Sequence, residues 1–293
     1  MSKIPQVNLN MNPVVFVTGC HRSGTSALAK LLSYSPSVNW LGWEMNYEFE
    51  NFIHLDEAGS SVGRVERSVR FGEMLAKYRA LSIINDGGSA SDVARNDFLY
   101  LIKSPNLLDK VEELSRVAGR LIPVVVIREV YSYVASMKKH LEKMGRQRKS
   151  GMRWSEEKDT WEIVKDISLH AKCERSFPGG NVYYIAKSWL KRNYNAVSRL
   201  GDSAIYVSFE SLMSDHASVF EDVCAKVGLG RESIGMPGDL LEADTVYNYV
   251  GSSDPLKSWE TELSAEEKRQ VEKACRDMAL MFSAVEEKRA SGV

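Results

Sequence analysis

Several features that mark special classes of protein are scarce in this chain of 293 residues. Four cysteines are present: Cys20, Cys173, Cys224 and Cys275. They lie far apart and form no C-x-x-C pair, which argues against a structural metal site or a disulfide framework and favours reduced thiols. The longest apolar run, residues 121–127, has seven residues, whereas a membrane-spanning helix needs about 20. We therefore expect no membrane span.

An excess of charge of one sign is also absent, because 38 Lys and Arg residues stand against 39 Asp and Glu residues. The net charge of −1 excludes the global positive field that is typical of nucleic-acid-binding proteins. The start of the chain, MSKIPQVNLNMNP, contains no apolar stretch or cleavage site of a secretory signal, and no lipidation pattern occurs at either end. We expect a cytoplasmic protein without a nucleic-acid partner, and the sequence leaves the oligomeric state open.

What is present is the composition of an ordinary globular chain, with 44% hydrophobic and 26% charged residues. The chain contains no internal repeat and no low-complexity linker, so we expect one domain over residues 1–293, of which residues 1–12 form a flexible tail. Five short segments are almost continuously apolar, as strands buried on both faces of a parallel sheet are: residues 14–18, 98–102, 121–127, 181–185 and 204–209.

Helical patterns alternate with these strands, at residues 25–34, about 62–82, 107–117, 131–144 and 188–200. Ser104 before Pro105 suits an N-cap with proline at the first helical position. Ser264 and Glu267 have the spacing of a capping box before a C-terminal helix. The alternation predicts βαβ units and thus an α/β fold, a single doubly wound domain with a central parallel sheet and helical additions. Its ligand is expected at the carboxyl ends of the strands.

A glycine-rich segment separates the first predicted strand from the first helix. It reads Gly19-Cys20-His21-Arg22-Ser23-Gly24-Thr25-Ser26, which has the spacing of a phosphate-binding loop. Glycines let backbone N–H groups and the helix N-terminus converge on an anion, and the hydroxyls of Thr25 and Ser26 add donors. Thr25 stands where such loops carry a lysine, so Arg22 is the cation available to replace it. A plain strand-to-helix turn is the alternative, which the two correctly spaced glycines disfavour.

The ends of two other predicted strands carry cations where a metal-dependent nucleotide hydrolase has a carboxylate. Residues 98–102 run into Lys103, and residues 121–127 run into Arg128. Positive side chains there would contact an anion directly and repel a divalent metal, so we expect chemistry without a metal. Ser136, two helical turns beyond Arg128, is expected to grip a second phosphate together with that arginine. A surface arginine and a solubilising helix serine are the alternative.

These residues resemble the sulfotransferases that use 3′-phosphoadenosine-5′-phosphosulfate (PAPS). The glycine-rich segment looks like their 5′-phosphosulfate loop, and Arg128 with Ser136 looks like their 3′-phosphate motif. The Leu-Ile-Lys-Ser-Pro segment at residues 101–105 is similar to the lysine-containing strand end of the carbohydrate and tyrosyl-protein members. Residues 207–212 resemble their aromatic-Glu-x-Leu element, with Phe209 replacing the frequent tyrosine. Trp259 and Leu263 fall where many members have a late Trp and Leu.

The resemblance implies a role for each residue of the donor site. Thr25 and Ser26 would hold the 5′-phosphate, and Arg22 would contact the sulfuryl group in transfer. Arg22 and Lys103 would stabilise the charge that develops on the sulfuryl oxygens and the departing phosphate, as catalytic residues. The residues implied in donor binding are His21, Arg22, Ser23, Gly24, Thr25, Ser26, Arg128 and Ser136. PAPS would be the donor, and no metal would be needed.

Transfer to a hydroxyl also requires a base near the acceptor. The cytosolic small-molecule members have a histidine two residues beyond their lysine, where this chain has Pro105. The other branches use a glutamate shortly after the phosphate loop. Glu44 best matches the spacing of the tyrosyl-protein members, and Glu48 would share its face if this segment is helical. A solvated acidic turn is the alternative for both glutamates.

The sequence thus predicts a PAPS-dependent sulfotransferase that acts on a hydroxyl of a glycan, a glycolipid or a small natural product, with tyrosine as a further acceptor. A phosphate-loop kinase or nucleotide hydrolase would share the fold, but Thr25 and the missing metal aspartate disfavour it. A catalytically silent nucleotide-binding protein would share the donor residues.

The basic run between Lys138 and Arg153 is more typical of a solvated face than of an anion contact.

Overall fold

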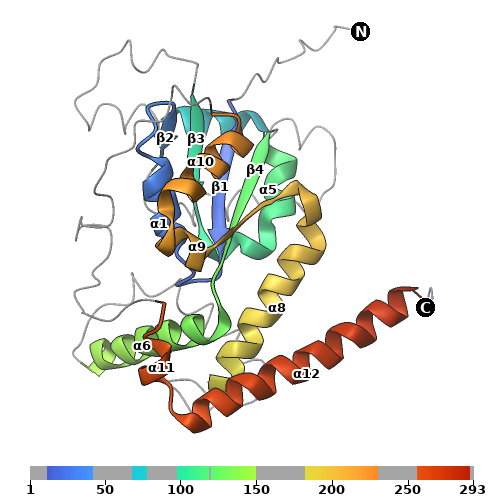
Figure 1. The fold of residues 1–293 in the computed structure, drawn as a ribbon. Coiled ribbons are helices and arrows are strands. Elements are labelled where there is room, and N and C mark those ends of the chain that lie inside the picture. The colour runs from blue at the N-terminus through green and yellow to red at the C-terminus, as the bar shows by residue number, and fades with distance from the viewer. Residues whose placement is uncertain are drawn as a thin grey trace, which may run out of the picture.

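The computed structural model describes residues 12–41, 68–77, 98–118, 120–149, 182–229 and 256–290. A parallel five-stranded sheet in the order β2-β3-β1-β4-β5 lies at its centre (Figure 1). The strands are β1 (Val14–Gly19), β2 (Val38–Trp40), β3 (Leu99–Lys103), β4 (Leu121–Ile127) and β5 (Ile205–Ser208). Because β1 pairs with β3 on one side and with β4 on the other, the carboxyl ends of these three strands meet at one edge of the sheet.

The central strands are apolar on both faces. Val14 and Phe16 of β1 belong to one hydrophobic core, whereas Val15 and Val17 belong to the other. Alternate residues of a strand point to opposite faces, so a sheet covered on both sides requires a nearly continuous apolar run. The predicted parallel sheet is therefore confirmed, and its two cores explain why the strands do not alternate with polar residues.

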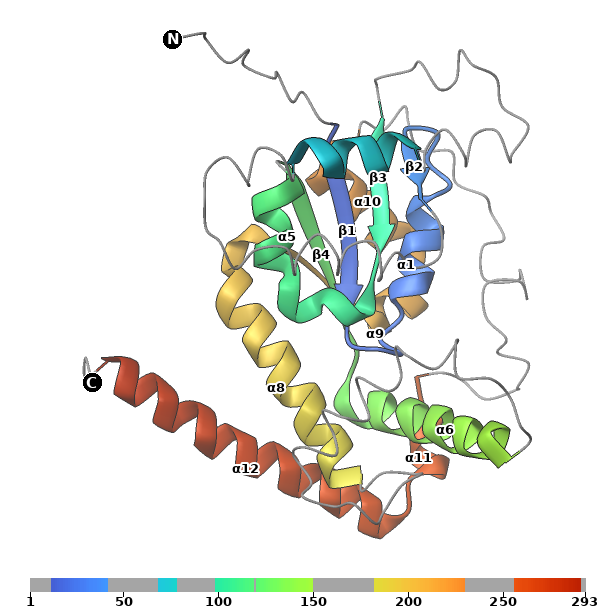
Figure 2. The ribbon, with the colours of Figure 1, turned by 180° about the vertical axis from the view of Figure 1, so that it is seen from behind.

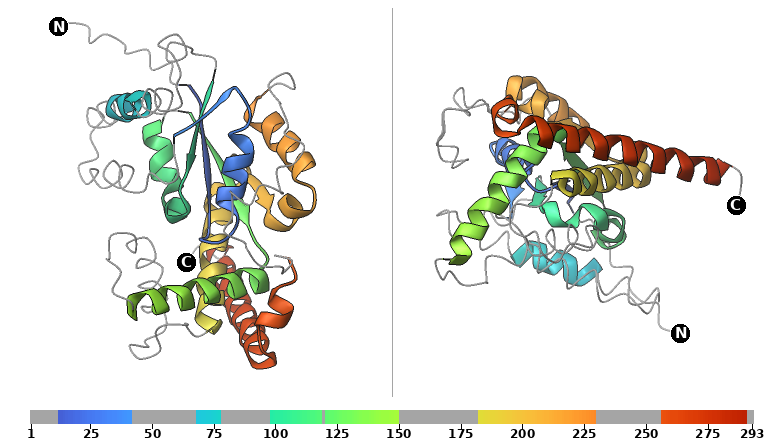
Figure 3. Two further views of the ribbon diagram at one scale, coloured as in Figure 1. Left: turned by 90° about the vertical axis from the view of Figure 1, so that its left-hand side faces the viewer. Right: turned by 90° about the horizontal axis from the view of Figure 1, so that it is seen from below.

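Helices cover both faces of the sheet, as the edge-on view in Figure 3 shows. One face carries α1 (Thr25–Leu32), α9 (Phe209–Ser214) and α10 (His216–Val227). The other carries the 3-10 helix η1 (Pro105–Lys110), α5 (Val111–Ala118) and a helix over residues 68–77. The predicted doubly wound α/β fold is confirmed.

Four further helices lie beyond the carboxyl ends of the strands or extend past them (Figures 1 and 2). They are α6 (Val130–Lys149), α8 (Val182–Leu200), α11 (Trp259–Glu262) and α12 (Ala265–Ala290), and a short 3-10 helix, η3 (Gly201–Ser203), follows α8. Helix α12 runs along α8, where the Tyr183 hydroxyl donates to Asp277 Oδ2 at 2.7 Å. This hydrogen bond raises the pKa of Tyr183 to about 12, since the carboxylate favours the protonated phenol.

The predicted strand at residues 181–185 is wrong, because residues 182–185 form the first turn of α8. Val182, Ile185 and Ala186 are buried at a spacing of three and four residues, which is the period of a helix. Packing of this stripe against the core overrides the strand preference of the Val-Tyr-Tyr-Ile segment. The sequence also missed β2, since three residues are too few to show a strand pattern.

Of the two helix starts predicted from capping residues, the structure confirms one in full and the other in part. The capping box is confirmed, because the backbone N–H of Ser264 donates to Glu267 Oε2 at 2.8 Å and the N–H of Glu267 donates to Ser264 Oγ at 3.2 Å. Ser104 does precede the first helical residue, Pro105, but its side chain makes no capping hydrogen bond and the helix is of the 3-10 type. The helix expected at residues 107–117 is therefore divided into η1 and α5.

The start of the basic run on α6 contacts acidic residues of α11 and α12. Lys138 pairs with Glu267 at 2.6 Å, and Lys139 pairs with Glu262. The rings of Tyr131 and Trp259 pack at 4.9 Å between the same helices. These contacts join α11 and α12 to α6, and they pair both lysines with carboxylates of the same chain. Within the described stretches, no helix has the length and apolarity needed to cross a membrane.

Candidate functional site

The predicted phosphate loop joins β1 to α1 at the carboxyl edge of the sheet. Gly19 has φ 155°, and a Cβ there would lie 2.4 Å from the carbonyl oxygen of Val126 on β4. Gly24 has φ 94° and precedes α1; a Cβ there would lie 2.4 Å from Cδ2 of Phe209. Both glycines of the motif are therefore required by a close approach of another part of the chain. The loop is a tightly supported turn at the place where parallel sheets bind ligands.

We expect Gly24→Ala to destabilise the fold more than the matched change Gly228→Ala. Both glycines have positive φ, 94° and 85°, so both alanines carry a backbone strain of about 1–2 kcal/mol. Only the Cβ at Gly24 meets another side chain, whereas the Cβ at Gly228 enters open space. The clash with Phe209 adds a further loss of about 1–3 kcal/mol. Urea denaturation of the two variants measures the difference, and equal losses would contradict this account of the loop.

Arg22 occupies the middle of the loop in a left-handed conformation, with φ 66°. Among the described residues it is the only one with positive φ that is not glycine. Such a backbone persists where the surroundings hold it, and it is concentrated at functional sites. Here the Arg22 carbonyl accepts a hydrogen bond from Nη1 of Arg128 at 3.0 Å. The side chain is exposed, and its Nε donates to Ser136 Oγ on α6 at 3.5 Å.

Lys103 is the last residue of β3 and is 3% exposed. Its Nζ donates to Ser26 Oγ, in the first turn of α1, at 3.0 Å. The next residue, Ser104, fixes this strand end against β1, because its N–H donates to the Val17 carbonyl at 3.0 Å and its carbonyl accepts from Thr18 Oγ1 at 2.8 Å. The lysine is thus held beside the phosphate loop by the register of two neighbouring strands.

Arg128 follows β4 and is 2% exposed. Its Nε donates to Ser132 Oγ at 2.7 Å, while its Nη1 reaches the loop carbonyl of Arg22. The residue expected beside it, Ser136, instead accepts the hydrogen bond from Arg22. Ser132 lies one helical turn before Ser136, so the two serines share a face of α6. The sequence missed Ser132, although its spacing of four residues from Arg128 is a signal that could have found it.

The corner between β4 and α6 is fixed by two glutamates. The Glu129 carboxylate accepts hydrogen bonds from the N–H groups of Tyr131 at 2.9 Å and Ser132 at 2.8 Å, which caps the start of α6. The N–H of Glu129 in turn donates to Glu210 Oε1 at 3.0 Å. Glu210 belongs to α9, so this bond ties the strand end that carries Arg128 to the chain after β5.

The base of the loop packs against α8. Cys20 is fully buried, and its Sγ accepts a hydrogen bond from Asn193 Nδ2 at 3.4 Å. Ser23 is also fully buried, and its hydroxyl makes no hydrogen bond in the structure. A buried hydroxyl at the foot of a phosphate-type loop is a donor that a bound anion would satisfy. Cys20 has the burial of a packing residue and not of an accessible nucleophile.

The electrostatics of this edge favour an anion. Arg22 lies within the loop, Lys103 and Arg128 lie beside it, and α1 presents its positive N-terminus there with no acidic residue in its first turn. Two of the three cations are almost completely buried, where a charge is screened less by water. Within the described ranges, no group of three or more His, Cys, Asp or Glu residues is placed to hold a metal.

The structure brings most of the sequence-derived site residues to this one edge. The loop residues His21, Arg22, Ser23, Gly24, Thr25 and Ser26 lie together, with Lys103, Arg128 and Ser136 around them. Thr25 is buried and His21 is half-buried. The two candidate bases, Glu44 and Glu48, lie outside the described residues.

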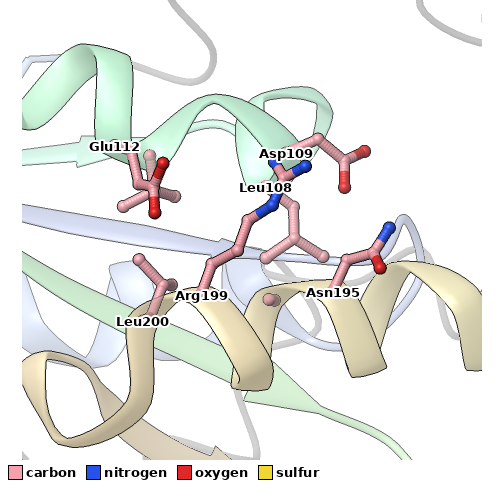
Figure 4. A pocket seen from close by; sticks show the side chains of 8 residues that line it. Leu108, Asp109, Glu112, Asn195, Arg199 and Leu200 are labelled. Atoms are coloured by element: carbon pink, nitrogen blue, oxygen red, sulfur yellow. The ribbon is translucent and has the colours of Figure 1, made fainter. Parts of the chain in front are cut away.

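A separate small pocket lies between η1, α5 and α8 (Figure 4). Leu108, Asp109, Glu112 and Arg199 line it, together with neighbours on the same helices. The Arg199 side chain extends from α8 toward η1. The pocket mixes both signs of charge and contains none of the sequence-derived site residues, so the edge around the phosphate loop remains the candidate site.

No family model matches the chain, and no curated protein matches it. Solved structures that it resembles include several sulfotransferases and a retinol dehydratase. The sulfotransferase domain of the Synechococcus PCC 7002 olefin synthase is 16% identical, with 92% of this chain and 95% of that chain covered and a TM-score of 0.43.

A sulfotransferase from Alicyclobacillus acidocaldarius is 14% identical, with coverages of 88% of this chain and 99% of that chain and a TM-score of 0.43. A retinol dehydratase in complex with androsterone and the inactive cofactor PAP is 15% identical, with coverages of 92% and 82% and a TM-score of 0.37. The activities and ligands in these names are those of the compared proteins.

Proposed function

We propose that the protein is a sulfotransferase that uses PAPS as donor and a hydroxyl as acceptor. One observation carries the proposal: a loop that contains the cation Arg22 lies beside the cations Lys103 and Arg128, and close contacts with other parts of the chain require its glycines. PAPS carries anionic groups at two places, the 5′-phosphosulfate and the 3′-phosphate. A loop at a helix N-terminus and a separate strand-end arginine match these two groups.

The chemistry of the donor set fits this ligand. The loop N–H groups, Thr25 and Ser26 would hold the 5′-phosphate, and the buried Ser23 hydroxyl is a further donor in the same loop. Arg128 would hold the 3′-phosphate, with Ser132 orienting its guanidinium and Ser136 completing the grip. Cationic and neutral donors of this kind bind phosphate oxygens without a metal.

The reaction follows from what these residues can do. The acceptor oxygen bonds to sulfur, the bond from sulfur to the bridging phosphate oxygen breaks, and a sulfate ester and 3′-phosphoadenosine-5′-phosphate (PAP) are formed. Glu44 would take the hydroxyl proton. Lys103 and Arg22 would stabilise the negative charge on the departing phosphate and on the sulfuryl oxygens. Removing one such fixed donor typically lowers kcat by about 10² to 10³.

The acceptor class is proposed from the residues beyond Lys103. Pro105 stands where the cytosolic small-molecule members have their histidine, and it begins η1. We therefore propose a glutamate and not a histidine as the base, and we propose a glycan or a small natural product as the acceptor.

We also propose that residues 1–293 act as one domain.

Transfer of labelled sulfate from PAPS to a panel of glycan, natural-product and tyrosine acceptors tests the function. We expect label on an acceptor together with an equal amount of PAP. Lys103→Met should remove this activity, whereas the matched change Lys226→Met should not, since Lys226 is exposed and paired with Asp222 on α10. PAPS binding without transfer to any acceptor would contradict the proposed sulfotransferase activity and favour a catalytically silent nucleotide-binding protein.

Transfer without a metal is a further expectation, and it contrasts with the metal-dependent chemistry of a kinase or nucleotide hydrolase. Cations stand at the ends of β3 and β4, where a metal-dependent enzyme needs a carboxylate. Transfer is therefore expected to continue at an unchanged rate in excess EDTA. The rate of label transfer with and without chelator measures this. Loss of activity in chelator that added Mg²⁺ restores would contradict the metal-free mechanism.

A further inference from the structure

Phe209, the first residue of α9, lies between the phosphate loop and Arg128. A Cβ on Gly24 would come within 2.4 Å of its ring, so the loop backbone and the ring are in direct contact. The Cζ atom of Arg128 lies 4.2 Å from the centre of the same ring, in the range of a cation–π interaction. The side chain is 5% exposed, which makes both contacts nearly free of water.

These contacts form a closed chain of interactions. Gly24 touches Phe209, Phe209 stacks with Arg128, and Arg128 donates to the carbonyl of Arg22, two residues before Gly24. The loop is thus held from two directions, by Arg128, which follows β4, and by Phe209 of α9. Arg22 has its positive φ at the point where its carbonyl accepts the 3.0 Å hydrogen bond from Arg128.

The position of Phe209 is itself fixed on either side. Ser208 caps α9, since its Oγ accepts a hydrogen bond from the N–H of Ser211 at 3.2 Å. Glu210 accepts the N–H of Glu129, which lies next to Arg128. The ring therefore has little freedom to move relative to the strand end that carries the arginine.

We propose that Phe209 is a positioning residue that sets the spacing between the two anion grips, the phosphate loop and Arg128. The inference rests on the proposed function, because it assumes that one ligand engages both grips at once. A ligand with one phosphate can bind to the phosphate loop or to Arg128 even if that group has moved. A bisphosphate requires both groups at the correct distance from each other. Loss of the ring should therefore weaken bisphosphate binding far more than monophosphate binding.

The test compares Phe209→Leu with the matched change Phe220→Leu. Phe220 is a buried residue of the same hydrophobic core, on α10. Calorimetry gives the affinities of each variant for PAP, adenosine 5′-phosphate and adenosine 3′-phosphate. Phe209→Leu should weaken PAP binding at least about tenfold, as expected for a desolvated cation–π contact, and should weaken each monophosphate by about threefold or less. Phe220→Leu should change all three affinities equally.

Two results would overturn the inference. One is a loss of PAP affinity no larger than in Phe220→Leu, and the other is an equal loss for PAP and both monophosphates. Urea denaturation establishes that the variants are folded, and Phe209→Met replaces Phe209→Leu if the latter is not.

If the wild type does not prefer PAP to the monophosphates, the proposed function fails. The positioning role is then judged by a crystal structure of the Phe209 variant. Loss of the contact between Arg128 and the Arg22 carbonyl would support the role, and an unchanged contact with Arg22 still at positive φ would overturn it.

Discussion

Glu44→Gln is expected to lower the rate of sulfuryl transfer by about 10² to 10⁴ while leaving the affinity for PAP nearly unchanged. The amide keeps the shape of the side chain and removes the base, so only the step that takes the acceptor proton is affected. Single-turnover measurements with a verified acceptor give the rate, and calorimetry gives the affinity. Because Glu44 lies outside the described residues, this prediction depends on its position in the sequence after the phosphate loop.

Two further variants make the result interpretable. Arg22→Ala should weaken donor binding and rate together, because this arginine is proposed to contact the donor both before and during transfer. Glu48→Gln is the matched control for the base. Normal turnover in Glu44→Gln with loss in Glu48→Gln would place the base four residues further along the chain. If neither change matters, the glutamate mechanism is wrong, and His21 or His54 becomes the next candidate.

Arg128→Ala is expected to remove most of the preference for PAP over adenosine 5′-phosphate. Loss of one partner from a buried, hydrogen-bonded charge pair costs about 2–5 kcal/mol, which corresponds to a fall in PAP affinity of about 30-fold or more. The affinity for adenosine 5′-phosphate should fall less. It should still fall, because Arg128 also holds the Arg22 carbonyl in the loop. Calorimetric titrations with both nucleotides measure the two losses.

The matched control is Arg120→Ala, which removes an exposed arginine just before β4, at the opposite end of the strand from Arg128. Its nucleotide affinities should equal those of the wild type. Arg128→Lys keeps a positive charge near the proposed 3′-phosphate. It loses the guanidinium group, which donates both to Ser132 and to the Arg22 carbonyl. An unchanged preference for PAP in Arg128→Ala would contradict the proposed binding of the 3′-phosphate by Arg128.

Most of the sheet could be predicted because its strands are buried on both faces. Such strands appear in the sequence as short apolar runs, and four of the five predicted runs contain strands. The fifth, at residues 181–185, contains the same residue types, and only its packing against the core makes it a helix. The three residues of β2 carry too little pattern for a prediction.

The candidate site divides in a similar way. The loop glycines and the cations Lys103 and Arg128 could be predicted, since each is adjacent in sequence to a strand end. The partners of these residues could not. The hydrogen bond from Arg22 to Ser136, and the ring of Phe209 between Gly24 and Arg128, depend on how distant segments pack. The sequence indicated which residue types are present at the site, and the fold determines which of them touch.

The most direct test of the central claim is a calorimetric titration of the wild-type protein with PAP beside ATP and GTP, each with and without Mg²⁺. Two separate anion grips and cations at the strand ends predict that PAP binds far more tightly than either triphosphate and that Mg²⁺ leaves its affinity unchanged. Tighter binding of ATP or GTP that depends on Mg²⁺ would contradict the account.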